Sequence, residues 1–409
     1  MKLIFNFLVT VIGVYISVGN ENDIDFLNPV HQFNESEPRD PFSLIKSKIE
    51  KKTQNHRFNS EKEFLMFLLN ELSIDPFSQL LVYSTTSLQL RKISIYNPRS
   101  IYFTDDIYIG FVPGGQIEVI GIDPKLGAIP YIFEIPKYGI IEQPIIHRSS
   151  RCMNCHASND IGGMPGLLIS SVIPGPGGGT LDRFRKNKIG HDIPFNVRFG
   201  GWHITGNNPF PDSWANKTGF MKNGNITKVD NSPGVNFNWN KYPVQSSAAA
   251  AHLIFEHQAG FTNLCIQATY EFRELINENK NLNKLNQFIQ KNTNELIEYI
   301  LFKNEPKIEN YKIDRNNPFV RNFENKKEGN LASNKFRKLN LKSRLLENRC
   351  SYMIFSKSFQ GLPKEIKSNV IKKLKILLNP NNFTEEYSYI GIEEKKEIFG
   401  TLRDLSEDL

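Results

Sequence analysis

The chain has 409 residues, of which 39% are hydrophobic, and its mean hydropathy is −0.39. This composition is too apolar for a disordered protein, and four cysteines are too few for a disulfide-stabilised scaffold. The formal charge of +7 is spread over a Lys- and Asn-rich chain without a dense basic stripe, which argues against nucleic-acid binding.

The N-terminal residues 1–19 have the pattern of a secretory signal peptide. Lys2 precedes a mostly apolar run, and the small residues Ser17 and Gly19 are suited to a cleavage site. The run is shorter than the roughly 20 residues that a membrane-spanning helix needs. We therefore expect a periplasmic or secreted protein whose mature chain begins near Asn20 and has no stable membrane span. An uncleaved anchor and a buried helix are the alternatives.

Residues 20–58 are predicted to be an irregular arm because they are polar and are interrupted by three prolines (Pro29, Pro38, Pro41). Residues 59–140 should contain a helix followed by a small antiparallel sheet. The helix is expected to begin at Ser60, which forms a capping box with Glu63: the serine caps an early amide and the glutamate reaches back.

The sheet is indicated by runs of β-branched and aromatic residues. The segments on either side of the Pro113-Gly114-Gly115 turn should pair as a hairpin. In the second strand of this hairpin the side chains alternate, so that Glu118 and Ile120 face the side opposite to Ile117 and Val119.

Residues 141–245 are rich in Gly, Pro and Asn and show little periodicity, which is typical of a long functional segment. Residues 246–409 are mainly helical by their apolar spacing, with helices expected from Ala248, from Leu282 and after Pro363. Together these regions predict an α+β chain with an N-terminal helix and sheet, a loop-rich centre and a helical C-terminal half.

The loop-rich segment contains a C-x-x-C-H motif at Cys152, Cys155 and His156. Two thiols at this spacing lie on one helical turn and can form thioethers with the two vinyl groups of a haem, and the following histidine can ligate the iron as the proximal ligand. The motif therefore predicts one covalent haem c per chain. The predicted export agrees with this, because haem attachment of this type in bacteria takes place outside the cytoplasm.

Two other interpretations of the same cysteines remain open. A zinc site could combine them with His156 or with Cys265 or Cys350, although the chain has no second C-x-x-C. A thioredoxin-like redox pair would need a βαβ context, which this region does not show. Outside the cytoplasm Cys265 and Cys350 could also pair as a disulfide or remain buried thiols.

A second axial ligand to the iron is not fixed by the sequence. The leading candidate is Met221, and Met164, His191 and His203 are the others. A methionine ligand is typical of electron-transfer haems, whereas an open sixth position would allow small molecules to bind.

The chain resembles a family of exported bacterial proteins that carry a single C-x-x-C-H motif. The resemblance extends through most of the mature chain and rests on several phrases, namely Tyr102–Tyr108, Val112–Gly115, Asp123–Gly127, the haem motif itself, Gly200–Trp202, Glu256–Gln258 and Cys350–Tyr352. It implies a c-type cytochrome-like protein and specifies no activity. The family carries a methionine shortly after the Gly-Gly-Trp phrase. If that methionine is the distal ligand in the family, the resemblance implies the same role for Met221, and His191 also matches a family histidine.

Two functions of different class follow from these expectations. The first is a monohaem electron-transfer protein that serves redox partner proteins. The second is a haem enzyme, peroxidase-like or a small-molecule oxidoreductase, with an open sixth coordination site. Electron transfer is the preferred function, and the haem enzyme is its alternative because a simple electron carrier needs far fewer residues than this chain has.

Overall fold

The computed structural model describes residues 23–184, 190–278, 281–326, 333–382 and 384–404, so the predicted leader at 1–19 lies outside the described residues. Helices and antiparallel sheets are both present, and the C-terminal half is helical, which confirms the α+β class. Among the described helices none combines the length and the apolar character that crossing a membrane requires.

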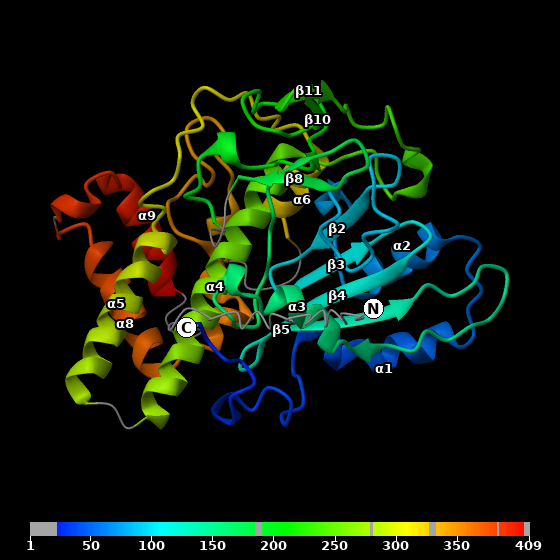
Figure 1. The fold of residues 1–409 in the computed structure, drawn as a ribbon. Coiled ribbons are helices and arrows are strands. Elements are labelled where there is room, and N and C mark those ends of the chain that lie inside the picture. The colour runs from blue at the N-terminus through cyan, green and yellow to red at the C-terminus, as the bar shows by residue number, and fades with distance from the viewer. Residues whose placement is uncertain (1–22, 185–189, 279–280, 327–332, 383, 405–409) are drawn as a thin grey trace, which may run out of the picture.

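A seven-stranded antiparallel sheet forms the centre of the N-terminal half (Figure 1). Its strand order is β6-β5-β4-β3-β2-β1-β9. The strands are β1 (Leu80–Val82), β2 (Arg99–Phe103), β3 (Ile107–Phe111), β4 (Gln116–Asp123), β5 (Gly127–Glu134), β6 (His147–Arg148) and β9 (Trp202–His203). The predicted hairpin is confirmed as β3 and β4, with Ile109 opposite Val119. Because β9 comes from the loop-rich region, the sheet combines strands from two of the regions that the sequence suggested.

Two helices, α1 (Pro41–Thr53) and α2 (Glu61–Glu71), cover one face of the sheet. The expected start of α2 is confirmed, since the Ser60 hydroxyl accepts the N–H of Glu63 at 3.1 Å. The Glu63 carboxylate reaches back to the N–H of Asn59 rather than to that of Ser60.

Helix α1 lies where an irregular arm was expected, and this expectation was wrong for that stretch. Pro41 occupies the first helical position, where its missing N–H costs nothing, and the side chain of Asp40 accepts the N–H groups of Phe42 and Ser43. The helix then buries Phe42 and Ile49 against the sheet. Pro41, one of the three prolines expected to interrupt the arm, is therefore part of a helix start.

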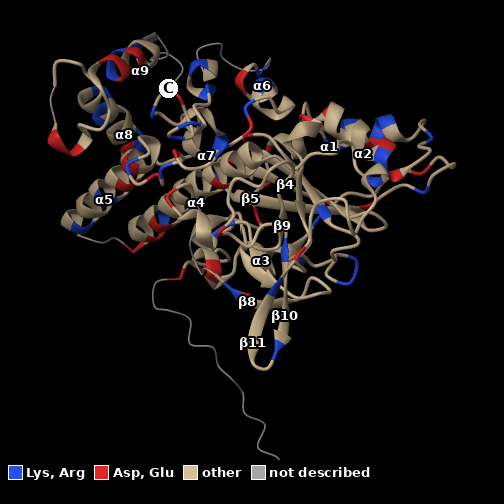
Figure 2. Cartoon of the chain, turned by 90° about the horizontal axis from the view of Figure 1, so that it is seen from above, with Lys and Arg blue, Asp and Glu red and all other residues tan. Residues whose placement is uncertain are grey.

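The opposite face of the sheet is covered by the 29-residue helix α4 (Ala249–Asn277) and by the loop-rich segment. That segment contains the short helix α3 (Met153–His156), the hairpin of β7 (Val172–Pro174) and β8 (Thr180–Arg183), and the hairpin of β10 (Lys217–Lys222) and β11 (Asn225–Asp230). Figure 2 shows the β10–β11 hairpin projecting from the body, and lysines, arginines and acidic residues mixed along the helices.

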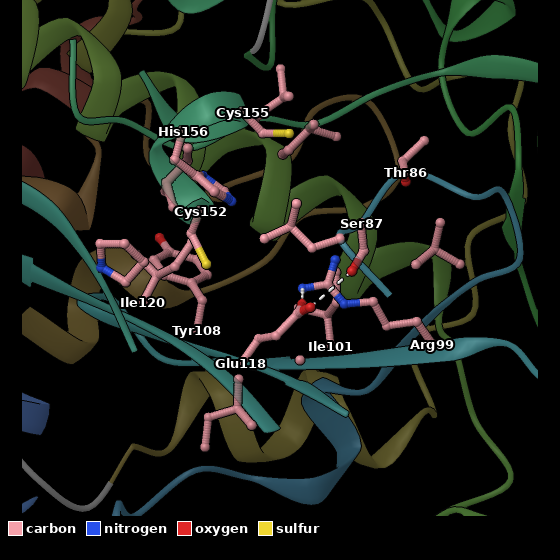
Figure 3. Close-up of a pocket in the computed structure, with 18 of the residues that line it drawn as sticks. Thr86, Ser87, Arg99, Ile101, Tyr108, Glu118, Ile120, Cys152, Cys155 and His156 are labelled. Atoms are coloured by element: carbon pink, nitrogen blue, oxygen red, sulfur yellow. Dashed lines mark hydrogen bonds and ion pairs between the residues drawn. The ribbon is translucent and has the colours of Figure 1, made fainter. Parts of the chain in front are cut away.

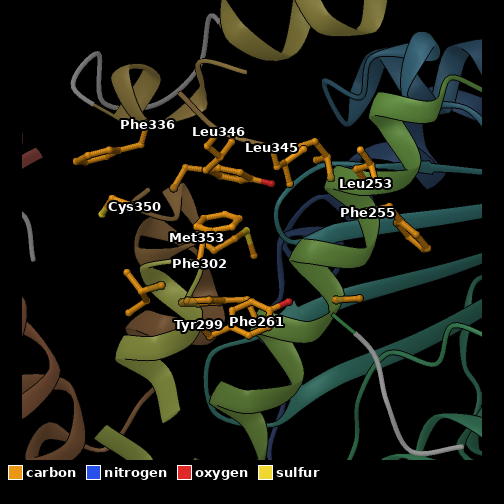
Figure 4. Packing of buried hydrophobic residues seen from close by; sticks show 14 of the residues in the cluster. Leu253, Phe255, Phe261, Tyr299, Phe302, Phe336, Leu345, Leu346, Cys350 and Met353 are labelled. Carbon is orange, nitrogen blue, oxygen red and sulfur yellow. The ribbon is translucent and has the colours of Figure 1, made fainter. Parts of the chain in front are cut away.

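The C-terminal half packs around α4 and continues the same core (Figure 4). Its helices are α5 (Leu282–Ile300), α6 (Pro318–Glu324), α7 (Lys357–Gln360), α8 (Lys364–Leu377) and α9 (Ile392–Asp404). The expected starts of α4, α5 and α8 agree with these bounds within one residue. Short 3-10 turns connect the larger elements at Pro29–His31, Pro76–Ser78, Ser150–Cys152, Asn159–Ile161, Phe195–Val197, Trp239–Lys241, Ser333–Arg337, Tyr352–Phe355 and Glu385–Tyr387.

Candidate functional site

The C-x-x-C-H motif lies on one helical turn at the edge of the sheet. Cys152 ends a 3-10 turn, and α3 follows it directly and ends at His156. The turn is fixed to the sheet because β6 pairs with β5 immediately upstream and the N–H of Ser149 donates to the carbonyl of Pro130. Met153 anchors the turn by packing into the core that α1 and α2 share with the sheet.

The imidazole of His156 is oriented by a backbone carbonyl. Nδ1 lies 3.0 Å from the carbonyl oxygen of Gly166, which can only accept, so Nδ1 carries the proton and Nε2 keeps its lone pair. Burial lowers the pKa of His156, which favours the neutral form that ligates metals. The turn at Gly166 is itself held by Asn263 of α4, which makes two hydrogen bonds of 2.8 Å to the backbone of Leu167. A carbonyl that fixes the tautomer in this way is typical of ligating histidines.

Cys152, Cys155 and His156 line one wall of a cavity, and strands β2, β3 and β4 form the facing wall (Figure 3). Most of its lining is apolar or aromatic: Ile101, Tyr108, Ile120, Leu167, Ile169, Trp202 and Phe255. This largely apolar lining with a few polar groups is typical of a site for an organic cofactor.

An ion pair interrupts the apolar lining on the sheet side. Nη2 of Arg99 lies 2.5 Å from Oε2 of Glu118. Oε1 of Glu118 accepts hydrogen bonds from Oγ of Ser87 at 2.8 Å and from Nε2 of Gln89 at 3.0 Å. Burial alone would raise the pKa of Glu118, but Arg99 and these hydrogen bonds hold it below its usual value, so the carboxylate is charged.

Arg99 and Glu118 were not identified as site residues from the sequence. The strand alternation did place Glu118 on the correct face, and a charged residue on an otherwise apolar face was the available signal. Arg99 could not be assigned in the same way, because its position opposite Glu118 depends on the register of three strands.

The two cysteines of the motif are free thiols, and burial raises the pKa of each. A raised pKa disfavours the thiolate that redox exchange and zinc binding need. Within the described part of the chain, no three His, Cys, Asp or Glu residues are grouped so that they could hold a metal ion. Cys265 and Cys350 are separate buried thiols.

The structure does not bring Met221 to the cavity. Met221 lies on β10 two residues before the Asn223-Gly224 turn, and 60% of its side chain is exposed. Its role as a distal ligand stays a prediction, and in this arrangement that role would require the hairpin to move.

The other candidate ligands are also placed elsewhere. Met164 is buried in a small cluster with Ile24, Ile266 and Tyr270. Nδ1 of His191 lies 2.8 Å from Nδ1 of His257, and the ring of His203 packs at a tilt against that of Tyr83, with centroids 4.4 Å apart. None of the three is among the described residues that line the cavity.

Comparisons with models of known protein families, with curated proteins and with solved structures find no match to this chain.

Proposed function

We propose that Cys152 and Cys155 attach one haem c by thioether bonds and that His156 is the proximal iron ligand. The observation that carries this proposal is the convergence of both sulfurs and the imidazole on one wall of a largely apolar cavity. The hydrogen bond from Nδ1 of His156 to Gly166 supports it, because it leaves Nε2 available for the metal.

The residues that line the cavity fit a covalently attached haem in three respects. Two thiols and one neutral imidazole are the donor set that a c-type haem requires. The apolar side chains of Ile101, Ile120 and Phe255 exclude water from the space next to α3. The carboxylate of Glu118 is neutralised by Arg99, so no unpaired charge faces that space. When bound, the haem would supply a one-electron redox centre and an iron that can take a sixth ligand.

The function that follows is electron transfer by an exported monohaem protein, with redox partner proteins as donors and acceptors. In this role the chain holds the imidazole in one orientation through Gly166 and Asn263 and keeps water away from the centre. The resemblance to exported proteins with a single C-x-x-C-H motif also supports this assignment.

A second function is favoured by one observation. Among the described residues that line the cavity there is no methionine, and His156 is the single histidine. This arrangement supports an iron whose sixth position is open to small molecules, as in a haem enzyme. Replacing Met221 or Met164 with Leu distinguishes the two functions: electron transfer with a methionine ligand predicts that one variant becomes high-spin. An open site predicts that both variants keep the wild-type spectrum.

The proposal is tested by expressing the chain together with haem-maturation machinery and recording a pyridine haemochrome spectrum after denaturation. A c-type band that stays with the denatured chain is expected for the wild type and should be lost in the double variant Cys152→Ala/Cys155→Ala. The matched control Cys350→Ala, which removes a thiol outside the motif, should keep the band. A wild-type chain without bound haem would refute the proposal.

A further inference from the structure

Arg99, which lines the cavity, carries a buried hydrogen-bond donor that lacks a partner among the described residues. Nη2 of Arg99 is paired with Glu118, but Nε of the same guanidinium is buried and makes no hydrogen bond. A buried N–H of a charged group that is left unsatisfied is costly, so its position calls for an explanation. The guanidinium lies over Gly110 of β3, where any side chain would collide with it.

The charges on this wall limit the kind of ligand that fits. Glu118 neutralises Arg99, so the wall offers a strong donor without a net positive charge. Glu118 is itself held by Ser87 and Gln89, which keeps the pair in place. Such a wall suits a small ligand with one hydrogen-bond-accepting atom and at most a single negative charge. A phosphate or another multiply charged anion would be repelled by the carboxylate.

The pair also faces the haem motif. Figure 3 shows Arg99 and Glu118 on the sheet wall and the two sulfurs with His156 on the wall formed by α3. A group attached to α3 would occupy the space between these walls, and a small molecule bound on the sheet side of that group would meet the wall that carries Arg99.

We propose that Nε–H of Arg99 is the recognition donor for a small oxygen- or nitrogen-based ligand, such as azide, nitrite or hydrogen peroxide, bound on the sheet side of the cavity. This proposal rests on the proposed haem site and adds the ligand class and the residue that selects it. The same donor could serve a carboxylate of the haem itself, and the experiment separates these two sources.

The experiment uses the haem-loaded protein, after the haemochrome spectrum has shown covalent haem. Azide binding to the oxidised form and carbon monoxide binding to the reduced form are measured by optical titration. The variants are Arg99→Gln, which removes the charge, and Arg99→Lys, which keeps a cation for Glu118 but lacks the Nε–H. The matched control is Arg91→Gln, an exposed arginine in the segment before β2.

The wild type and Arg91→Gln should bind azide alike, and both Arg99 variants should bind it about 10- to 100-fold more weakly. Carbon monoxide is a weak acceptor, so its affinity should change by less than about threefold. Unchanged azide affinity in Arg99→Gln would overturn the proposal, as would a wild type that binds no azide.

An equal loss of affinity for both ligands would also overturn the proposal, because it would assign Arg99 a structural role. A shifted reduction potential with unchanged azide affinity would assign the donor to a haem carboxylate and overturn the small-ligand proposal. A chain without covalent haem would instead refute the proposed function itself, and the haemochrome spectrum detects this before any titration.

Discussion

Asn263 of α4 holds the turn that orients His156, and its replacement by Ala tests whether this bracing matters. The side chain accepts the N–H of Leu167 and donates to its carbonyl, both at 2.8 Å in a buried site. Asn263→Ala removes both hydrogen bonds and leaves two buried backbone groups unsatisfied. At about 1–2 kcal/mol for each group, the free energy of unfolding should fall by about 2–4 kcal/mol.

The assay is urea unfolding of the protein, followed by tryptophan fluorescence. Gln267→Ala is the matched control, since Gln267 lies one turn further along α4, is exposed, and its side chain donates to the side chain of Glu271. The control should lie within about 0.5 kcal/mol of the wild type. If Asn263→Ala were as stable as the control, the turn at Gly166 would be held by other contacts, and our account of how His156 is oriented would be wrong.

Two further predictions concern stability. Phe42→Ala removes a fully buried ring between α1 and the sheet and should cost about 3–5 kcal/mol in urea unfolding, whereas Leu44→Ala on the exposed side of α1 should change little. Burial raises the pKa of Asp106 from 3.8 to about 7, so its charge destabilises the folded state at high pH and this penalty disappears as the pH falls to about 4. Asp106→Asn should therefore be more stable than the wild type at pH 8 and equally stable near pH 4; equal stability at both pH values would contradict this.

The parts of the fold that were predictable are those that local sequence determines. Ser60 and Glu63 mark the start of α2 through contacts within one turn. The β3–β4 hairpin follows from its turn and from the alternation that puts Glu118 and Ile117 on opposite faces. Helix α4 was predictable because its apolar residues keep a helical spacing without interruption. A pattern of that length can be recognised without knowing which distant residues the helix contacts.

Other parts were missed although a local signal existed. Pro41 was interpreted as a breaker, but with Asp40 before it the same residue starts α1. Asn223-Gly224 is a strong hairpin turn, with φ values of 51° and 78°, and it joins β10 to β11. Recognising this turn would have placed Met221 on an exposed hairpin before any question of iron ligation arose.

The candidate site also has a part that the local sequence predicts and a part that depends on the tertiary fold. The motif at Cys152, Cys155 and His156 is contiguous, so its helical turn could be anticipated. The carbonyl of Gly166 and the side chain of Asn263 reach the site from positions that only the tertiary fold brings close. Arg99 meets Glu118 because three strands share one register. The sequence of neither strand predicts the contact between Arg99 and Glu118.

The order of the central sheet has a consequence for the behaviour of the protein at high concentration. Both outer strands, β6 and β9, are only two residues long. A long outer strand exposes a row of unpaired N–H and C=O groups on which another chain can add a strand. Here each edge strand pairs over only two residues. After β6 the chain continues into α3, and after β9 it continues into loops. Because β6 and β9 are so short, they are hard to find in the sequence, and they also protect the sheet against edge-to-edge aggregation.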